Sequence, residues 1–110
     1  MDKLTEKRCA PCEGGVDPMT RADFEVYLEQ VSEWDIIDDK SLERTFEFSD
    51  FKQALEFVNK AGDIAEEEGH HPDLFIHSWN KVKVILWTHA IGGLSINDFV
   101  VASKIDRISV

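Results

Sequence analysis

The chain has 110 residues, of which 43% are hydrophobic and 31% charged, and its formal net charge is −10. This length and composition predict one soluble globular domain, and no apolar run approaches the roughly 20 residues that a membrane-spanning helix needs. The acidic balance argues against nucleic-acid binding, which rests on clustered Lys and Arg. Because no apolar segment follows the charged start, we read no secretory signal and expect a cytoplasmic protein.

Residues 1–18 form a predicted N-terminal arm, and the domain proper is expected over residues 19–110. The arm contains Gly14-Gly15 and two prolines, with little hydrophobic periodicity. Cys9 and Cys12, the two cysteines of the chain, could form half of a zinc site or a redox pair. The second half of a zinc site is missing, so we favour an arm that is unstructured or packed in an oligomer.

The first half of the domain predicts a helix followed by two strands. Thr20 to Asp23 resemble a helix start, and an apolar face follows at Phe24, Tyr27, Leu28 and Val31. The short apolar segment 34–37 and the alternating segment 42–48 flank a polar turn, which favours two antiparallel strands.

The second half predicts a helix, a hairpin and a last helix. A helix capped by Asp50 and stopped by Gly69 has an apolar stripe that comprises Phe51, Ala54, Leu55, Val58, Ala61, Ile64 and Ala65. Strands are expected over 74–79 and 81–88, turning near Asn80. Ser95 begins a final helix that buries Ile96, Phe99, Val100 and Ile105. The element order α-β-β-α-β-β-α predicts an α+β fold.

The histidines provide the main functional signal. His70 and His71 follow the end of the second helix, and His89 is expected at the end of the last strand. Pro72 pushes His71 toward an extended conformation, so the two adjacent rings should diverge and a third could close over the same hollow. The helix dipole favours a protonated imidazole at this end, and Glu66 adds to that tendency. An imidazolium acid beside a neutral base is the pairing that dehydration requires.

Simpler interpretations remain open for each of these residues. The adjacent histidines could be ordinary surface residues at a helix end, or three imidazoles could form an open zinc site, although neighbouring rings suit a metal poorly. His77 would share a strand face with Phe75 and Trp79 and cover the sheet. Asp98 lies three residues after Ser95, where an acidic residue completes a helix cap. Trp79 and Trp87 are typical of sheet packing.

Together these residues form a spaced pattern: Glu66, His70-His71-Pro72, Trp79, His89 and Asp98. The pattern resembles that of the pterin-4a-carbinolamine dehydratase family, and the resemblance covers about residues 20 to 108. Even the segment from Cys9 to Gly15 resembles the start of bacterial members. One departure is that Trp79 stands where Tyr is common in the family, at the longer of the allowed spacings from His71.

The resemblance implies a four-stranded antiparallel sheet with helices packed on one face, in homodimers or homotetramers. It implies loss of water from a 4a-hydroxytetrahydropterin to give quinonoid dihydropterin, which recycles the cofactor of aromatic amino acid hydroxylases. No metal or organic cofactor is expected. The implied catalytic residues are His70, His71 and His89, with either His89 or His70 protonating the departing hydroxyl. The implied substrate-binding residues are Glu66, Pro72, Trp79 and Asp98.

The resemblance also leaves a non-enzymatic alternative. Animal members of the family serve as dimerisation cofactors of a homeodomain transcription factor, which they bind through a helix. The apolar stripe of the second helix could support such an interface here, or simple self-association. The bacterial-like arm argues against that particular partner.

Overall fold

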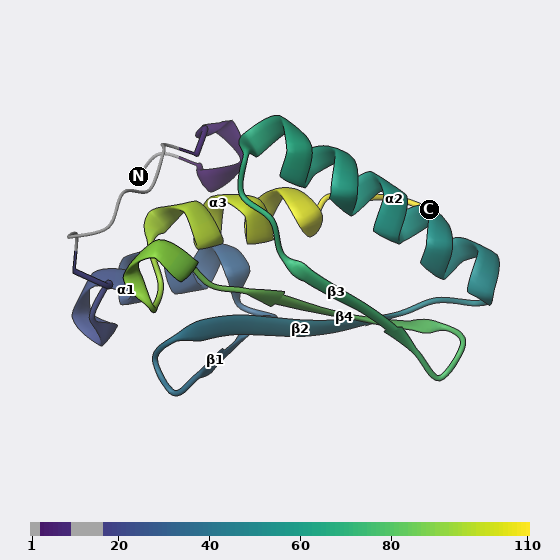
Figure 1. Ribbon diagram of the computed structural model, residues 1–110, viewed down its shortest axis with the longest axis horizontal. Coiled ribbons are helices and arrows are strands. Elements are labelled where there is room, and N and C mark those ends of the chain that lie inside the picture. Colours follow the sequence, from purple (N-terminus) through teal and green to yellow (C-terminus); the bar gives the residue numbers. More distant parts are fainter. Residues whose placement is uncertain (1–2, 10–16) are drawn as a thin grey trace.

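The computed structural model describes residues 3–9 and 17–110, and its elements follow the predicted order (Figure 1). The helices are α1 (Arg21–Leu28), α2 (Phe51–Glu68) and α3 (Ile96–Ile105). The strands are β1 (Asp35–Ile37), β2 (Ser41–Glu47), β3 (Asp73–His77) and β4 (Lys81–Leu86). Short 3-10 turns occur at η1 (Leu4–Glu6), η2 (Glu29–Val31) and η3 (His89–Ile91). None of the described helices is long and apolar enough to cross a membrane.

The four strands form one antiparallel sheet in the order β1-β2-β4-β3, and the helices cover one of its faces (Figure 1). Alternation along the central strands separates the two faces. Leu42, Val82 and Val84 are fully buried beneath the helices, whereas Lys83 and Glu43 form a 2.9 Å ion pair on the open face. The predicted α+β fold is therefore confirmed.

Local signals at the helix ends act as predicted. Thr20 and Asp23 form a capping box at α1, and Asp50 accepts the Gln53 N–H at the start of α2. Gly69 ends α2 in the left-handed conformation, with φ 66°, which a residue without Cβ adopts readily.

The apolar stripe of α2 differs from the prediction at two positions. The buried face is centred on Ala54, Phe57 and Ala61, whereas Phe51 and Leu55 are 48% and 42% exposed. Each residue advances about 100° around a helix, so a face centred on Ala54 and Phe57 leaves Leu55 on the flank. Placing Phe51 and Leu55 in the buried stripe was therefore wrong.

The N-terminal arm is partly built into the domain. Leu4 is 0% exposed within the core, and its backbone N–H donates to Gln30 Oε1 over 2.8 Å. An unstructured arm is thus wrong for residues 3–9, because Leu4 fills a core position. Burial, with the Glu68 carboxylate nearby, raises the pKa of Cys9 to about 12, which disfavours the reactive thiolate. Cys12 lies outside the described residues, and the boundary at residue 18 stays a prediction.

Glu68, the last residue of α2, joins three parts of the chain. Its side chain is 2% exposed and accepts from Lys104 Nζ over 2.6 Å and from the Cys9 N–H over 2.9 Å. Arg8 Nε lies 3.3 Å from the same carboxylate. Burial alone would raise the pKa of Glu68, but the bonds from Lys104 and Cys9 outweigh it and the pKa is lowered. The carboxylate therefore fastens residues 8–9 and α3 to the end of α2.

The Glu68→Gln variant should unfold about 1–3 kcal/mol more easily at neutral pH, because Lys104 loses its charged acceptor. A lowered folded-state pKa stabilises the fold above the ordinary value of 4.5, and this contribution is lost as pH falls through the folded pKa. The gap between variant and wild type should therefore narrow in acid. Urea unfolding at neutral pH and below pH 4.5 measures it. In the control Glu67→Gln the replaced side chain is 68% exposed, so little should change; an equal loss there would contradict the assignment.

Candidate active site

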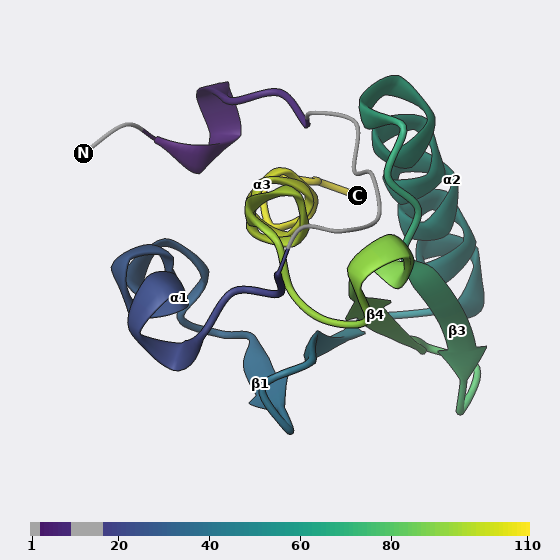
Figure 2. The same ribbon diagram turned by 60° about the vertical axis from the view of Figure 1, so that its left-hand side comes forward.

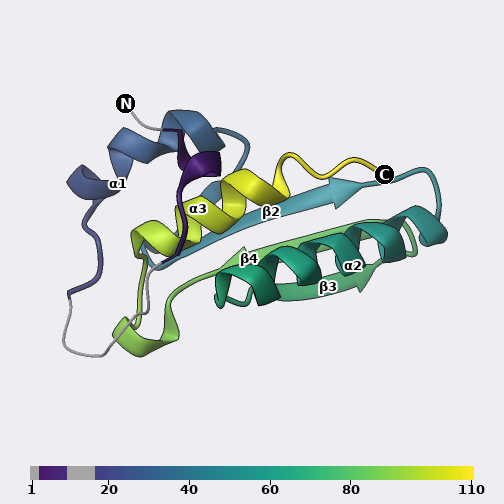
Figure 3. The same ribbon diagram turned by 90° about the horizontal axis from the view of Figure 1, so that it is seen from above.

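Three of the four histidines line one hollow of ≈ 470 Å³. The residues that line it lie just after the C-terminal end of α2, at the start of β3 and in η3. Figures 2 and 3 show the ribbon of these segments lying side by side. The structure therefore brings together three residues separated by up to 19 positions. The complete lining is Gly69, His70, His71, Pro72, Asp73, Trp87, Thr88, His89, Ala90 and Asn97.

His70 is placed by the way α2 ends. Gly69 turns the chain, and the His70 N–H donates back to the Ala65 carbonyl over 3.2 Å, which is the six-to-one bond of a Schellman motif. The imidazole then points inward with its side chain 12% exposed, and its Nε2 lies 2.6 Å from Asp98 Oδ1. The local turn thus delivers the ring to a buried carboxylate.

Asp98 is 0% exposed and its two oxygens meet three donors. Oδ1 contacts His70 Nε2, and Oδ2 accepts from the Thr88 hydroxyl over 2.7 Å and the Ser95 N–H over 3.0 Å. A carboxylate only accepts, so His70 Nε2 carries the hydrogen, and in the neutral ring Nδ1 is the nitrogen that can accept a proton. The predicted helix cap is therefore present on Oδ2, whereas Oδ1 contacts the His70 ring.

His71 and His89 lie at the open rim. His71 is 61% exposed, with Nε2 3.7 Å from Glu66 Oε1, whose own side chain is 82% exposed. His89 is exposed on η3, and its ring lies against Trp87 with centroids 3.8 Å apart. These two imidazoles can exchange protons with solvent, whereas His70 is enclosed.

Of the four predicted substrate-binding residues, two lie at the hollow or directly behind it and two lie elsewhere. Pro72 lines the hollow and Asp98 lies directly behind His70. Glu66 instead faces the neighbouring groove between α2 and β3. Trp79 lies in the turn between β3 and β4, 62% exposed, at the opposite end of that hairpin from the hollow.

Sequence reasoning missed Thr88 and Asn97 as lining residues and interpreted Trp87 only as a packing residue. The available signal for Thr88 was its position directly before His89. His77 packs its ring against Phe75 at 5.4 Å on the open face of the sheet. Within residues 3–9 and 17–110, no three His, Cys, Asp or Glu side chains are arranged to hold a metal ion.

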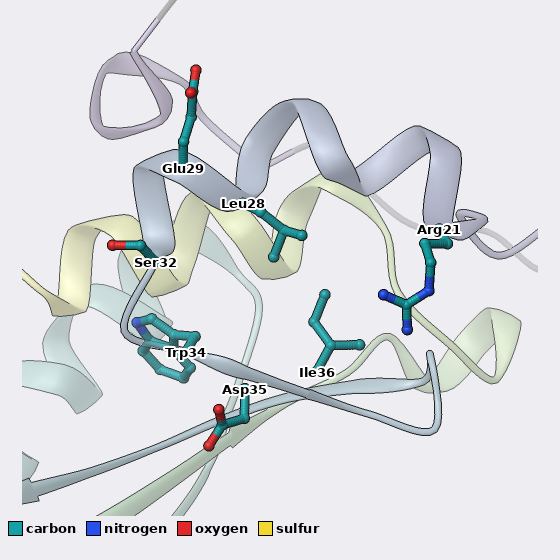
Figure 4. A pocket seen from close by; sticks show the side chains of 7 residues that line it. All are labelled: Arg21, Leu28, Glu29, Ser32, Trp34, Asp35 and Ile36. Atoms are coloured by element: carbon teal, nitrogen blue, oxygen red, sulfur yellow. The ribbon is translucent and has the colours of Figure 1, made fainter.

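A second hollow of ≈ 470 Å³ lies between α1 and β1 (Figure 4). Leu28 and Ile36 point into it, whereas Glu29 points away. Its main polar groups already have partners: Arg21 pairs with Asp39 at 2.6 Å, and Trp34 Nε1 donates to Asp106 over 2.8 Å. It contains no histidine, so the hollow at the end of α2 is the candidate active site.

The chain is similar to known proteins over most of its length. The family model described as pterin 4 alpha carbinolamine dehydratase matches residues 17–108. A protein of Alkaliphilus metalliredigens, which carries that enzyme name provisionally, is 48% identical over 97% of this chain and 96% of its own. An Arabidopsis thaliana protein named pterin-4-alpha-carbinolamine dehydratase 2, mitochondrial, is 42% identical over 97% of this chain and 59% of its own.

A solved structure is also similar. It is the crystal structure of a transcriptional coactivator/pterin dehydratase from Brucella melitensis, which matches with a TM-score of 0.75 and 31% identity. The match covers 82% of this chain and 96% of the Brucella chain. The similarity therefore extends to the arrangement of helices on the sheet.

The Asp98→Asn variant should lower the free energy of unfolding by about 1–3 kcal/mol, because one amide oxygen cannot satisfy three buried donors. Urea unfolding measures the loss. The matched control is Asp23→Asn, which changes the equivalent cap position of α1 at an exposed site. A loss at Asp23 as large as that at Asp98 would show that capping alone explains the effect.

Proposed function

Because the chain belongs to the pterin-4-alpha-carbinolamine dehydratase family, an enzyme family, we propose that it removes water from a 4a-hydroxytetrahydropterin. The product is quinonoid dihydropterin, and the reaction recycles the cofactor of aromatic amino acid hydroxylases. The observation that carries the proposal is the set of three imidazoles around one hollow, one of them held by a buried carboxylate. The hollow falls within the usual size range for small-molecule sites, about 300–1,000 Å³.

Dehydration needs an acid and a base on one substrate. The C4a–O bond breaks with its electron pair on oxygen, and an acid supplies the proton that completes the water molecule. A base removes a proton from a neighbouring ring nitrogen, whose electron pair forms the new C=N bond. No electrons are gained or lost overall, so the chemistry needs only proton carriers.

We assign the base to His70 and the acid to His89. When His70 takes a proton at Nδ1, the ring becomes an imidazolium whose Nε2–H faces the Asp98 carboxylate at 2.6 Å, which stabilises the positive charge. His89 is exposed beside Trp87, so it can regain a proton from solvent after giving one to the hydroxyl. His71 and Pro72 would contact the bound pterin from the rim. A catalytic role for His71 stays a prediction, as does substrate contact by Glu66 and Trp79.

Purified protein treated with a chelator should accelerate the dehydration of a 4a-hydroxytetrahydropterin, followed by ultraviolet absorbance. His70→Ala and His89→Ala should each slow this turnover roughly 100-fold or more, because each removes a proton carrier. His77→Ala is the matched control, since that ring lies on the open face of the sheet and should leave turnover unchanged.

Full turnover in a variant lacking both His70 and His89 would refute the assigned roles. No acceleration by the wild-type protein would refute the enzymatic proposal itself. Acceleration that returns only when zinc is added would replace metal-free proton transfer with metal chemistry at the same residues.

A second candidate function is protein association through the outer face of α2. Phe51 and Leu55 lie one turn apart on that face, 48% and 42% exposed, and the partly buried Val58 continues the row. Two such faces from separate copies of the chain could pack together as a homodimer, or two pairs as a homotetramer. The coactivator role in the name of the Brucella protein belongs to that protein. For this chain, self-association is the simpler proposal.

The Leu55→Glu variant should shift the protein toward monomer in analytical ultracentrifugation, because a carboxylate would be buried in the interface. Its dehydration rate should change little, since the hollow lies at the other end of α2. Glu56→Gln, at the neighbouring position, is the control and should leave the assembly intact. An unchanged oligomer in Leu55→Glu would exclude this face as the interface.

The cellular compartment also stays a proposal. We propose the cytoplasm for this chain. The Arabidopsis relative is named as mitochondrial, so location varies among similar proteins.

A further inference from the structure

We infer that Thr88 is a positioning residue for the proposed reaction, because its hydroxyl group holds the Asp98 carboxylate that orients His70. This inference rests on the proposed function and adds to it a residue outside the spaced histidine pattern. Thr88 is 2% exposed and forms part of the wall of the hollow. Its Oγ1 lies 2.7 Å from Asp98 Oδ2 and 2.8 Å from Ser95 Oγ.

The direction of each hydrogen bond follows from counting donors. Thr88 has one hydroxyl hydrogen, and the Asp98 carboxylate can only accept, so that hydrogen goes to Oδ2. Ser95 must then donate its own hydroxyl hydrogen to Thr88 Oγ1. Asp98 Oδ2 therefore accepts from Thr88, just after β4, and from the Ser95 N–H at the start of α3. Oδ1 faces His70.

The backbone of Thr88 performs a second task. Its N–H donates to the Gly93 carbonyl over 2.8 Å, and the Gly93 N–H returns a bond to Thr88 over 3.4 Å. This bridge closes the loop that contains η3 and His89. Gly93 is required there, because a Cβ would lie 2.7 Å from Pro18 Cβ. Thr88 therefore helps to position both proposed proton carriers. Its hydroxyl acts on His70 through Asp98, and its backbone bridge closes the loop that contains His89.

Loss of the Thr88 hydroxyl should lower kcat more than it weakens substrate binding. Valine keeps the shape of threonine, so the wall of the hollow and the backbone bridge would remain. Asp98 Oδ2 would keep only the Ser95 N–H, and the carboxylate could rotate away from His70 Nε2. The neutral ring would then no longer be confined to the tautomer that presents Nδ1 as the base.

The test compares Thr88→Val with Thr88→Ser, which restores the hydroxyl. In Thr88→Val, kcat should fall roughly 10–100-fold, by analogy with the loss seen when the hydrogen-bond partner of a metal-ligating histidine is removed, with KM nearly unchanged. Long-range ¹H–¹⁵N spectra of histidine-labelled protein should show the His70 ring changing from a single Nε2–H tautomer to a mixture. Thr88→Ser should retain both the wild-type tautomer and kcat within a few-fold.

The inference is overturned if Thr88→Val keeps the wild-type tautomer and kcat. It is also overturned if kcat falls as far in Thr88→Ser as in Thr88→Val, because retaining the hydroxyl would then not preserve the reaction. Should Thr88→Val fail to fold, Thr88→Ala against Thr88→Ser makes the same comparison. If the wild-type protein does not dehydrate the pterin, the proposed function fails, while the tautomer spectra still decide whether Thr88 orients His70.

Discussion

The buried Asp98 carboxylate is the constraint on which the rest of the site depends. Its donors come from three elements: His70 just after α2, Thr88 just after β4, and Ser95 at the start of α3. Burying a charge without such partners would be costly, so the three elements must meet at this point in the folded chain. Folding stability and the orientation of a proposed catalytic ring are therefore properties of the same hydrogen bonds.

A second buried carboxylate also holds the end of α2, from which His70 follows. Glu68 lies two residues before His70 and ties the end of α2 to Lys104 on α3 and to the backbone of Cys9. Residues 3–9 consequently contribute to the position of the α2 terminus although they lie outside the matched family region, which begins at residue 17. Residues 8–9 are therefore part of the framework that holds the end of α2 in place.

Much of the fold could be predicted because its signals are local. The Thr20 and Ser95 caps, the Gly69 stop and the alternation along β2 each depend on residues within a few positions. The positions of His70, His71 and His89 in the sequence already indicated one shared hollow, and the resemblance to a family implied their catalytic roles. Local signals could not show that Leu4 enters the core, because its contacts lie on α3 and at Gln30, 26 residues or more away. Thr88 was missed for a related reason. Its partner Asp98 is close in sequence, but the same carboxylate also contacts His70, which follows α2 and is distant in sequence.

The loop between Thr88 and Gly93 has fixed ends and one exposed position at which the side chain can vary. Its ends are fastened by the backbone bridge, whereas Ala90 is exposed at the rim of the hollow. A change of side chain at Ala90 would alter the shape that a substrate's substituent meets, yet it would leave the Asp98 hydrogen bonds in place. Substrate preference can thus diverge among descendants of this chain while the groups proposed for proton transfer keep their positions.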